Sequence, residues 1–363
     1  MSHPNVSTLV RRSVGTLALV GAAVLIAAGC GSDADSKQSN SGSKQSADST
    51  TKLVVYSGRE QEIVEGMYKS FEKKSGIKLD VRYGDSAALT AQMLEEGKKS
   101  PADVFYAQDA GAIGAIEDML AELPTALLEQ VPSQFRDPDN RWTGVTGRAR
   151  TLVYNTDELK EADLPDNVFG VLDPAWKGKV GVAPTNGSFI AFMSAMRLEL
   201  GEDKALEFLE GLKANDAKTY EKNGPVVDAV AKGEVQVGLV NHYYLYERLA
   251  DDSDLPIANH FFKPGDIGNL INTSAVGMLA SSDKQDAAQE LIDFLLTDGQ
   301  TYIVEEAPER EYPLSTTTSI ENSERYKELP ALDKIGAPEF DLSQLGAELE
   351  KTVALITKSG LGS

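Results

Sequence analysis

Two adjacent tyrosines, Tyr243 and Tyr244, are the side chains in this sequence best suited to binding a metal ion. They follow the mostly apolar run 235–240 and so stand at the carboxyl end of a predicted buried strand. A phenol has a pKa of about 10, which makes it a poor ligand for most cations. A small, highly charged ion such as Fe³⁺ lowers that pKa and favours hard oxygen anions. Two phenolates and one carboxylate would therefore balance the charge of a ferric ion.

A packing role is the alternative interpretation of the same residues. Tyr243, Tyr244 and Tyr246 have the spacing of aromatic residues on an amphipathic helix, and the pattern alone favours that role. His242 precedes the pair, and neighbours in an extended segment point to opposite sides. We therefore expect His242 to support the site rather than to bind in it.

Few residues are present for other chemistries. The chain of 363 residues has one cysteine, Cys30, and three histidines, so an internal disulfide cannot form and a cysteine-based zinc site lacks ligands. Neither a Gly-x-Ser-x-Gly elbow nor a glycine-rich phosphate-binding motif occurs. A secreted hydrolase is therefore the least favoured of the functions considered, and we expect that the protein is not an enzyme.

The composition is that of an acidic globular protein. Lys and Arg total 35 against 56 Asp and Glu, which gives a net charge of −21. Such a surface repels phosphate backbones, so we expect no nucleic-acid partner. The length suits two domains, and the 41% hydrophobic content is close to the globular norm.

The first 51 residues have the features of an export signal and a tether. Arg11 and Arg12 precede the apolar run 14–29, which is too short to span a bilayer as a helix and predicts a signal peptide over residues 1–29. The sequence Ala27-Ala28-Gly29-Cys30 resembles a bacterial lipobox, in which Cys30 is lipidated and becomes the mature N-terminus; an uncleaved anchor fits the short run less well. Residues 30–51 are polar and are expected to form a flexible tether.

Strands and helices are expected to alternate along the rest of the chain and to position the tyrosines. Strands at 53–56, 79–84 and 103–106, separated by helices, predict a parallel sheet. Ligands bind outside the carboxyl ends of such strands, here 57–60, 85–86 and 107–109. The pattern recurs in strand 179–184, a helix that opens at 185–188, helices at 204–212 and 226–232, and strand 235–240. Runs 150–154 and 273–279 flank this half, where we place two crossings between lobes.

Several stretches, in the same order, resemble the ferric-ion-binding proteins of bacterial ABC importers. The resemblance extends from about Leu53 to Leu314 and includes Val55-Tyr56-Ser57-Gly58, Ser100-Pro101-Ala102-Asp103-Val104-Phe105-Tyr106, Gly147-Arg148-Ala149-Arg150, Val182-Ala183-Pro184-Thr185-Asn186-Gly187-Ser188, Tyr220-Glu221-Lys222-Asn223, Asn241-His242-Tyr243-Tyr244 and Glu311-Tyr312-Pro313-Leu314. It implies an α/β fold of the two-lobed, type II periplasmic-binding-protein kind, with a mostly parallel sheet flanked by helices in each lobe and a ligand cleft between them. It also favours the metal-binding interpretation of the tyrosines over packing.

The resemblance also implies a ligand set. Tyr243 and Tyr244 fall on the family's paired iron ligands, and Glu60 falls where many members have a histidine. The family's carboxylate ligand falls on Gln108, whose neutral amide is a weak ligand; Asp109, next in the chain, is the substitute considered.

A helper anion, phosphate or carbonate, accompanies the metal in this family. The matching positions are Asn186, Gly187 and Ser188 at a predicted helix N-terminus, where free amides favour an anion, and the side-chain donors Asn223 and Asn241. Arg59 and Arg148 are expected either to contact the anion or a cleft carboxylate or, as the favoured alternative, to form structural salt bridges.

The resemblance leads to a transport function. We expect a monomeric lipoprotein on the outer face of the membrane in a Gram-positive type envelope, which captures Fe³⁺ and delivers it to the permease of an ABC importer powered by a separate ATPase. Residues 52–147 with 272–315 would form the N-terminal lobe, and 148–271 with 316–363 the C-terminal lobe. The alternative keeps the fold and changes the ligand to a polyamine, an organic cation or an oxyanion.

Overall fold

The computed structural model describes residues 51–318, 323–327 and 329–362. The predicted signal peptide, Cys30 and the tether up to residue 50 lie outside these described residues. Within the described ranges, none of the helices combines the length and the apolar character that crossing a membrane requires.

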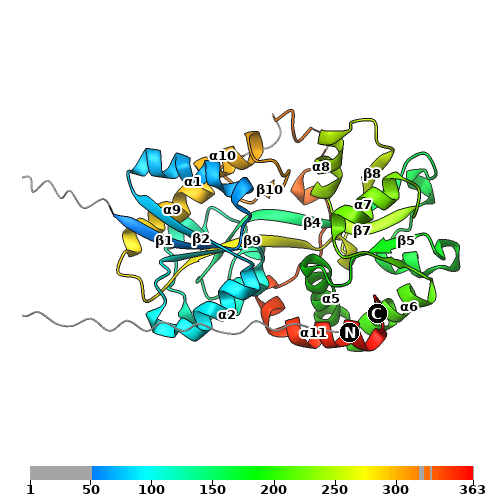
Figure 1. Ribbon diagram of the computed structural model, residues 1–363, viewed down its shortest axis with the longest axis horizontal. Helices are drawn as coiled ribbons and strands as arrows, with labels where there is room; N and C mark the ends of the chain where they lie inside the picture. The colour runs from blue at the N-terminus through cyan, green and yellow to red at the C-terminus, as the bar shows by residue number, and fades with distance from the viewer. Residues whose placement is uncertain (1–50, 319–322, 328, 363) are drawn as a thin grey trace, which may run out of the picture. The chain divides into compact units, whose positions relative to one another are not determined.

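A mixed sheet runs through the described residues in the strand order β2-β1-β3-β9-β4-β7-β5-β6 (Figure 1). β1 pairs in parallel with β2 and β3, and β5 pairs in parallel with β6 and β7, whereas the central strands β9 and β4 are antiparallel to their neighbours. The short strands β8 and β10 also pair with β4. The strands are β1 (Lys52–Ser57), β2 (Lys78–Tyr83), β3 (Val104–Ala107), β4 (Thr143–Asn155), β5 (Val180–Val182), β6 (Lys218–Thr219), β7 (Val237–Asn241), β8 (Ile257–His260), β9 (Ile271–Met278) and β10 (Tyr312–Pro313).

The long strand β4 joins two halves of this sheet. Residues 143–149 of β4 pair with β9, and residues 150–154 pair with β7. We call β2, β1, β3, β9 and the start of β4 the first half, and the end of β4 with β7, β5 and β6 the second half. The pairing partner changes between Ala149 and Arg150, at the start of the predicted run 150–154. The chain returns to the first half where β9 begins at Ile271, two residues before the predicted run 273–279.

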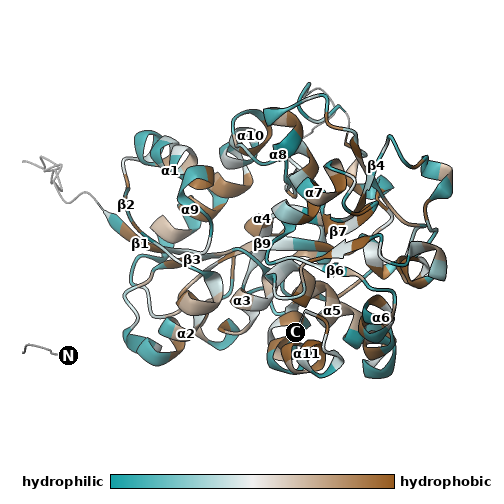
Figure 2. Cartoon of the chain, turned by 45° about the vertical axis from the view of Figure 1, so that its right-hand side comes forward, coloured by the Kyte–Doolittle hydropathy of each residue, from teal (hydrophilic) through white to brown (hydrophobic). Residues whose placement is uncertain are grey.

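Helices cover both faces of each half (Figures 1 and 2). In the first half α1, α9 and α10 lie on one face and α2 and α3 on the other; in the second half α7 and α8 lie opposite α5, α6 and α11. The C-terminal helix α11 packs against α5 and α6 and also against α3. The helices are α1 (Gln61–Ser75), α2 (Ser86–Glu96), α3 (Ala110–Gly114), α4 (Thr125–Leu128), α5 (Gly187–Leu200), α6 (Glu202–Ala214), α7 (Asn223–Ala231), α8 (Tyr243–Asp251), α9 (Gln285–Leu296), α10 (Asp298–Glu305) and α11 (Leu345–Ser359).

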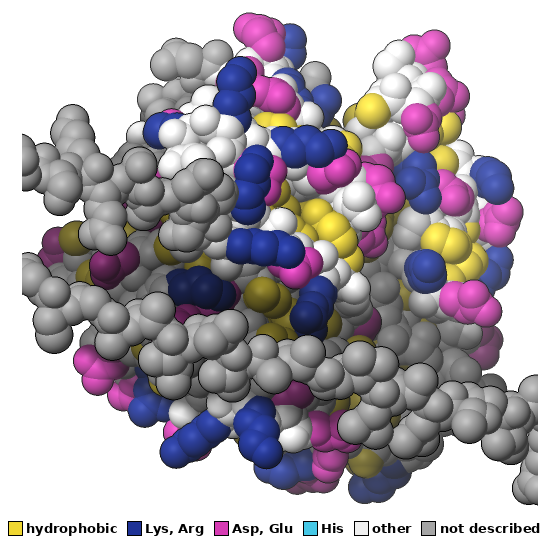
Figure 3. Space-filling view, turned by 60° about the vertical axis from the view of Figure 1, so that its left-hand side comes forward, with side chains coloured by type: hydrophobic (Ala, Val, Ile, Leu, Met, Phe, Trp, Pro, Cys, Tyr) yellow, Lys and Arg dark blue, Asp and Glu magenta, His cyan; other side chains and the backbone are white. Residues whose placement is uncertain are grey.

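Local sequence signals account for these elements. The apolar residues of α1 that face the sheet, from Ile63 to Phe71, are all buried, and the helix ends at Gly76, whose φ of 78° suits glycine. One face of the molecule carries interspersed basic and acidic side chains (Figure 3). The predicted alternation of strands and helices is therefore confirmed by the structure.

Candidate metal and anion site

Three helices begin where the three parallel strands of the second half end. β5 leads into α5 at Gly187, β6 into α7 at Asn223, and β7 into α8 at Tyr243. Because parallel strands point the same way, these helix N-termini meet at one edge of the sheet. Helix N-termini carry partial positive charge and free amide groups. This edge is therefore suited to binding oxygen anions, including ionised tyrosines.

The tyrosine pair forms the start of α8. The rings of Tyr243 and Tyr244 have centroids 4.3 Å apart and an angle of 31° between their planes. Burial raises the pKa of Tyr243 well above its ordinary value. Burial also raises the pKa of Tyr244, although hydrogen bonding to Tyr243 and Asn223 lowers it in part. Both phenols are therefore neutral near pH 7 in the metal-free protein, and a strongly charged cation is needed to ionise them.

His242 lies beside the pair, with its ring edge-to-face with that of Tyr243 (centroids 5.9 Å apart). Its backbone is helical (φ −57°, ψ −36°), so the extended segment expected from the sequence is wrong, because α8 begins immediately after β7. The ring is fully buried; Nδ1 accepts a hydrogen bond from the Ala149 amide, and Nε2 lies 2.8 Å from the Arg310 carbonyl oxygen. Burial lowers the pKa of His242 to about 4. His242 is thus a neutral residue whose hydrogen bonds tie α8 to β4 and to the segment before β10.

The predicted anion-binding residues cluster at the start of α5. The side-chain oxygen of Asn186 accepts hydrogen bonds from the Ser188 amide (3.0 Å), the Ser188 hydroxyl (2.7 Å) and the Asn223 side chain (3.1 Å). A Cβ atom placed on Gly187 would meet nothing within 4 Å, so the space above this turn is open. Three donors that converge on one oxygen form an arrangement in which an anion oxygen could replace the Asn186 carbonyl.

Arg150 completes this cluster, and the sequence argument missed it. Its guanidinium donates to Ser188 Oγ (3.2 Å), to Asn241 Oδ1 (3.1 Å) and to the carbonyl oxygen of Leu239 (3.0 Å). Burial lowers the pKa of Arg150 to about 10, so it stays charged at neutral pH. The signal that could have identified it is the alternation Arg148-Ala149-Arg150, which puts both arginines on one side of a predicted strand.

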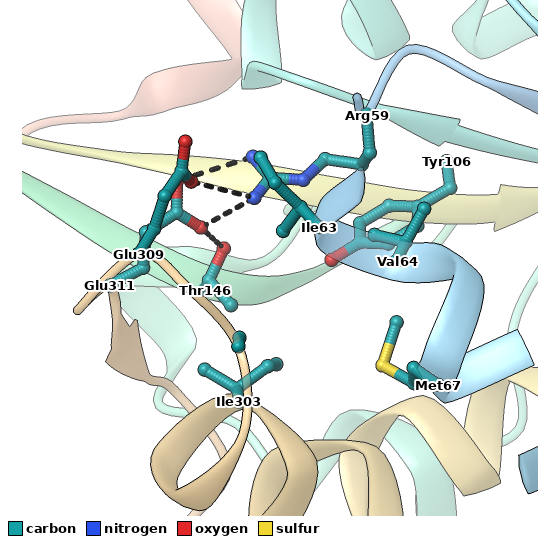
Figure 4. A pocket seen from close by; sticks show the side chains of 10 residues that line it. Arg59, Ile63, Val64, Met67, Tyr106, Thr146, Ile303, Glu309 and Glu311 are labelled. Carbon is teal, nitrogen blue, oxygen red and sulfur yellow. Dashed lines mark hydrogen bonds and ion pairs between the residues drawn. The ribbon is translucent and has the colours of Figure 1, made fainter. Parts of the chain in front are cut away.

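The first half contributes a buried cluster of charges (Figure 4). Arg59 follows β1 and pairs with Glu311 (2.9 Å) and Glu309 (3.5 Å), while the Nε atom of Arg148 lies 3.7 Å from Glu311. Burial alone would raise the pKa of Glu311, but the charges of Arg59 and Arg148 lower it overall. Burial and the neighbouring Glu311 raise the pKa of Glu309. Both arginines thus make the salt bridges weighed in the sequence argument.

The two weaker metal candidates have other partners in the structure. The side-chain oxygen of Gln108 accepts a hydrogen bond from Arg59, and its carbonyl oxygen accepts one from Arg148. Asp109 caps α3, since its carboxylate accepts a hydrogen bond from the Ala112 amide (2.9 Å). Both side chains thus have hydrogen-bond partners within the protein in this conformation.

Glu60 and Glu247 bring carboxylates to the same region from the two halves. Glu60 is the exposed residue before α1, and its side chain makes no capping hydrogen bond. Glu247 lies on α8, four residues after Tyr243, so it shares a helix face with the pair. Burial raises the pKa of Glu247 to about 7, and the charge of Glu60 contributes to the rise. The sequence argument missed both Glu247 and Glu309. The helical spacing of Glu247 from Tyr243 could have placed it beside the tyrosines, whereas nothing in the sequence indicated Glu309.

Any metal ion bound at this site would need the tyrosine oxygens as ligands. Among the described residues, no three His, Cys, Asp or Glu side chains are arranged to hold a metal ion. Neutral phenols, carboxylates and amide donors are nevertheless gathered from both halves. Hard oxygen donors of this kind suit a hard, highly charged cation rather than a soft one.

Comparison with known proteins agrees with this geometry. The chain matches a family described as bacterial extracellular solute-binding protein over residues 99–334. The Fe(3+)-binding periplasmic protein of Serratia marcescens is 30% identical over 354 residues, covering 96% of this chain and 98% of that protein. The major ferric iron-binding protein of Neisseria meningitidis is 31% identical over 320 residues, covering 85% and 93%. Iron-bound HitA from Pseudomonas aeruginosa superposes with a TM-score of 0.77 at 30% identity, covering 86% and 100%. These comparisons confirm the resemblance to ferric-ion-binding proteins seen in the sequence, and they confirm the two-lobed α/β fold that it implied.

Proposed function

Because this chain belongs to the bacterial extracellular solute-binding protein family, we propose that it captures ferric iron for uptake into the cell. Tyr243 and Tyr244 would bind Fe³⁺ as phenolates, and Glu60 would add a carboxylate from the other lobe. Binding needs no bond to be made or broken in a substrate, so the protein acts as a carrier rather than an enzyme.

The observation that carries this proposal is the position of the two stacked tyrosines. Their rings lie 4.3 Å apart at a helix N-terminus, with the Tyr244 hydroxyl beside Asn223 of the anion cluster. An ion bound by the phenolates would therefore adjoin the place where an oxyanion can bind. Phosphate or carbonate held by Asn186, Gly187, Ser188, Asn223 and Asn241 would complete the coordination of the metal.

The remaining parts of the proposal concern delivery. Residues 52–147 with 272–315 would form one lobe and 148–271 with 316–363 the other, and the lobes would close by hinge motion at the two crossings. A lipid on Cys30 would hold the monomer at the outer face of the membrane, where the closed form would dock on an ABC permease. The helix α11, which packs against both α5 and α3, would have to accommodate that motion.

A different ligand is the alternative. The side chain of Gln108, where the ferric-binding family has a carboxylate, is held by Arg59, so one metal ligand of the family pattern is missing. With the carboxylates of Glu60 and Glu247 close to each other, the region beside the tyrosines would then suit a polyamine or another organic cation, whereas the cluster at α5 would suit an oxyanion.

The test is a visible absorption titration of the chain from residue 52 with a weakly chelated ferric salt and phosphate. We expect a saturable coloured band from phenolate-to-iron charge transfer. Changing both Tyr243→Phe and Tyr244→Phe should abolish the band and lower ferric affinity by at least about 100-fold, since both phenolate ligands are lost. Tyr246→Phe on the same helix is the matched control and should leave the band intact. A colourless wild-type protein would reject iron and favour the alternative ligands.

A further inference from the structure

Arg150 differs from the other buried arginines in having no carboxylate partner. The guanidinium groups of Arg59, Arg148 and Arg197 have carboxylate oxygens at 2.9, 3.7 and 2.6 Å. Arg150 is only 4% exposed, yet it makes no ion pair in the described part of the chain. Its positive charge is therefore not balanced by any described side chain.

The surroundings of Arg150 are polar but neutral. Its three hydrogen-bond acceptors are a hydroxyl, a carboxamide and a backbone carbonyl, and the ring of Phe192 lies 5.5 Å away. A buried charge without a counter-charge is unfavourable by several kcal/mol in proteins. A bound ligand that carries negative charge would remove this cost by supplying the missing counter-charge.

The neighbours of Arg150 indicate where that ligand binds. Ser188 is in the first turn of α5, and Asn241 is the last residue of β7, so the guanidinium lies under the meeting point of two helix N-termini. Asn223 is fully buried there, and its side-chain amide donates hydrogen bonds to Asn186 Oδ1 (3.1 Å) and Ser188 Oγ (2.9 Å). An unbalanced cation and a buried amide donor therefore lie at the same place.

We propose that Arg150 is the fixed positive charge of this anion site and contributes to oxyanion binding whether or not a metal is bound. The inference rests on the proposed function and adds a residue to the five anion-binding positions taken from the sequence. Fe³⁺ with Tyr243, Tyr244 and Glu60 would be neutral, so Arg150 would still need an anion. Without Glu60 the total would be two positive charges, which one phosphate or carbonate dianion balances.

The test measures binding of inorganic phosphate to the metal-free full chain by isothermal titration calorimetry. The Arg150→Gln protein should bind phosphate at least about tenfold more weakly than wild type, as expected for losing a hydrogen bond from a charged donor. Arg150→Lys keeps the charge and should bind more tightly than Arg150→Gln. Arg197→Gln is the matched control, because Arg197 is a buried arginine about 14 Å further along α5 and pairs with Glu348. It should leave phosphate affinity unchanged.

Equal phosphate affinity in wild type and Arg150→Gln would overturn the inference, as would an equal loss in Arg197→Gln. If the Arg150→Gln protein does not fold, wild type alone decides, since absence of phosphate binding up to about 10 mM would exclude a useful site. The proposed function is tested separately by the ferric band. If phosphate binding depends on Arg150 but no ferric band appears, iron is rejected and the inference about Arg150 stands. If the ferric band appears but phosphate binding does not depend on Arg150, the proposed function stands and the inference is rejected.

Discussion

Arg148 and Arg150 lie two residues apart on β4, but in the described part of the chain only Arg148 has a carboxylate close to its guanidinium group. Arg148 belongs to the first half, where it and Arg59 share the carboxylate of Glu311. Arg150 belongs to the second half, where its hydrogen-bond acceptors are all neutral. The buried arginines of the first half are paired with carboxylates, whereas Arg150 in the second half is, among the described residues, an unpaired positive charge close to the two phenols proposed to bind metal.

If the proposed role of Arg150 is right, this difference separates residues that stabilise the fold from residues that bind a ligand. Removing one member of a balanced buried ion pair leaves the other uncompensated and destabilises the protein. Removing an unbalanced charge should affect stability little and ligand binding strongly. The predictions below test this contrast from the largest expected effect to the smallest.

Arg59→Met should reduce the free energy of unfolding of the metal-free protein by about 3–5 kcal/mol, because it leaves Glu309 and Glu311 with Arg148 alone. Urea unfolding followed by circular dichroism measures this. Arg82→Met, which removes an exposed arginine of β2, is the control and should change stability by less than about 1 kcal/mol. A loss below about 1 kcal/mol for Arg59→Met would mean that the first half does not depend on its ion pairs.

Ferric affinity should rise with pH, and the rise should come from the second half. The pKa values of Tyr243 and Tyr244 are raised by burial, so each phenol must release a proton when iron binds. Release of two protons would strengthen binding by up to about 100-fold per pH unit below those pKa values. Competition against a chelator of known pH dependence, between pH 6 and 8, measures the slope. A flat profile would contradict phenolate binding.

Glu247→Gln should change how the stability of the metal-free protein depends on pH. Since the pKa of Glu247 is raised by burial to about 7, its contribution to stability is present below its ordinary pKa and is lost as pH rises through the folded value. Relative to wild type, the variant should therefore be more stable at pH 8 than at pH 5, by about 1–2 kcal/mol after allowance for partial exposure. Urea unfolding of both proteins at both pH values tests this, and an identical difference at pH 5 and 8 would refute it.

Arg150→Gln should have the smallest effect on stability. It loses three hydrogen bonds but also removes a buried charge without a partner, so we expect a change within about 1 kcal/mol in the metal-free protein. The same urea experiment measures it beside Arg59→Met. A loss as large as that of Arg59→Met would show that Arg150 holds the fold instead of serving a ligand.

The elements of the fold were predictable from the sequence because their signals are local. Periodic apolar residues, Gly76 at the end of α1 and Asn186 at the start of α5 marked the helices where the structure has them. The positions of the tyrosines and of the α5 turn at strand ends followed from the same patterns. The helical start at His242 was missed, because a strand can pass directly into a helix without a separating turn residue.

The charge balance of the site could not be predicted in this way. Arg148 and Arg150 look alike in the sequence, and their different roles depend on Glu311, which lies more than 150 residues further along the chain. The sequence also did not show that the side chain of Gln108 accepts a hydrogen bond from Arg59 and that Asp109 accepts one from the Ala112 amide of α3.

The sequence by itself determined the order of strands and helices, the resemblance to ferric-ion-binding proteins and the place of the tyrosine pair. Periodicity and turn chemistry act over a few residues, which is why a sequence contains them. Only the tertiary structure decided which buried charges are paired and which carboxylates and amides face the tyrosines. Coulomb interactions and burial depend on distances between segments remote in the chain, and folding alone brings those segments together.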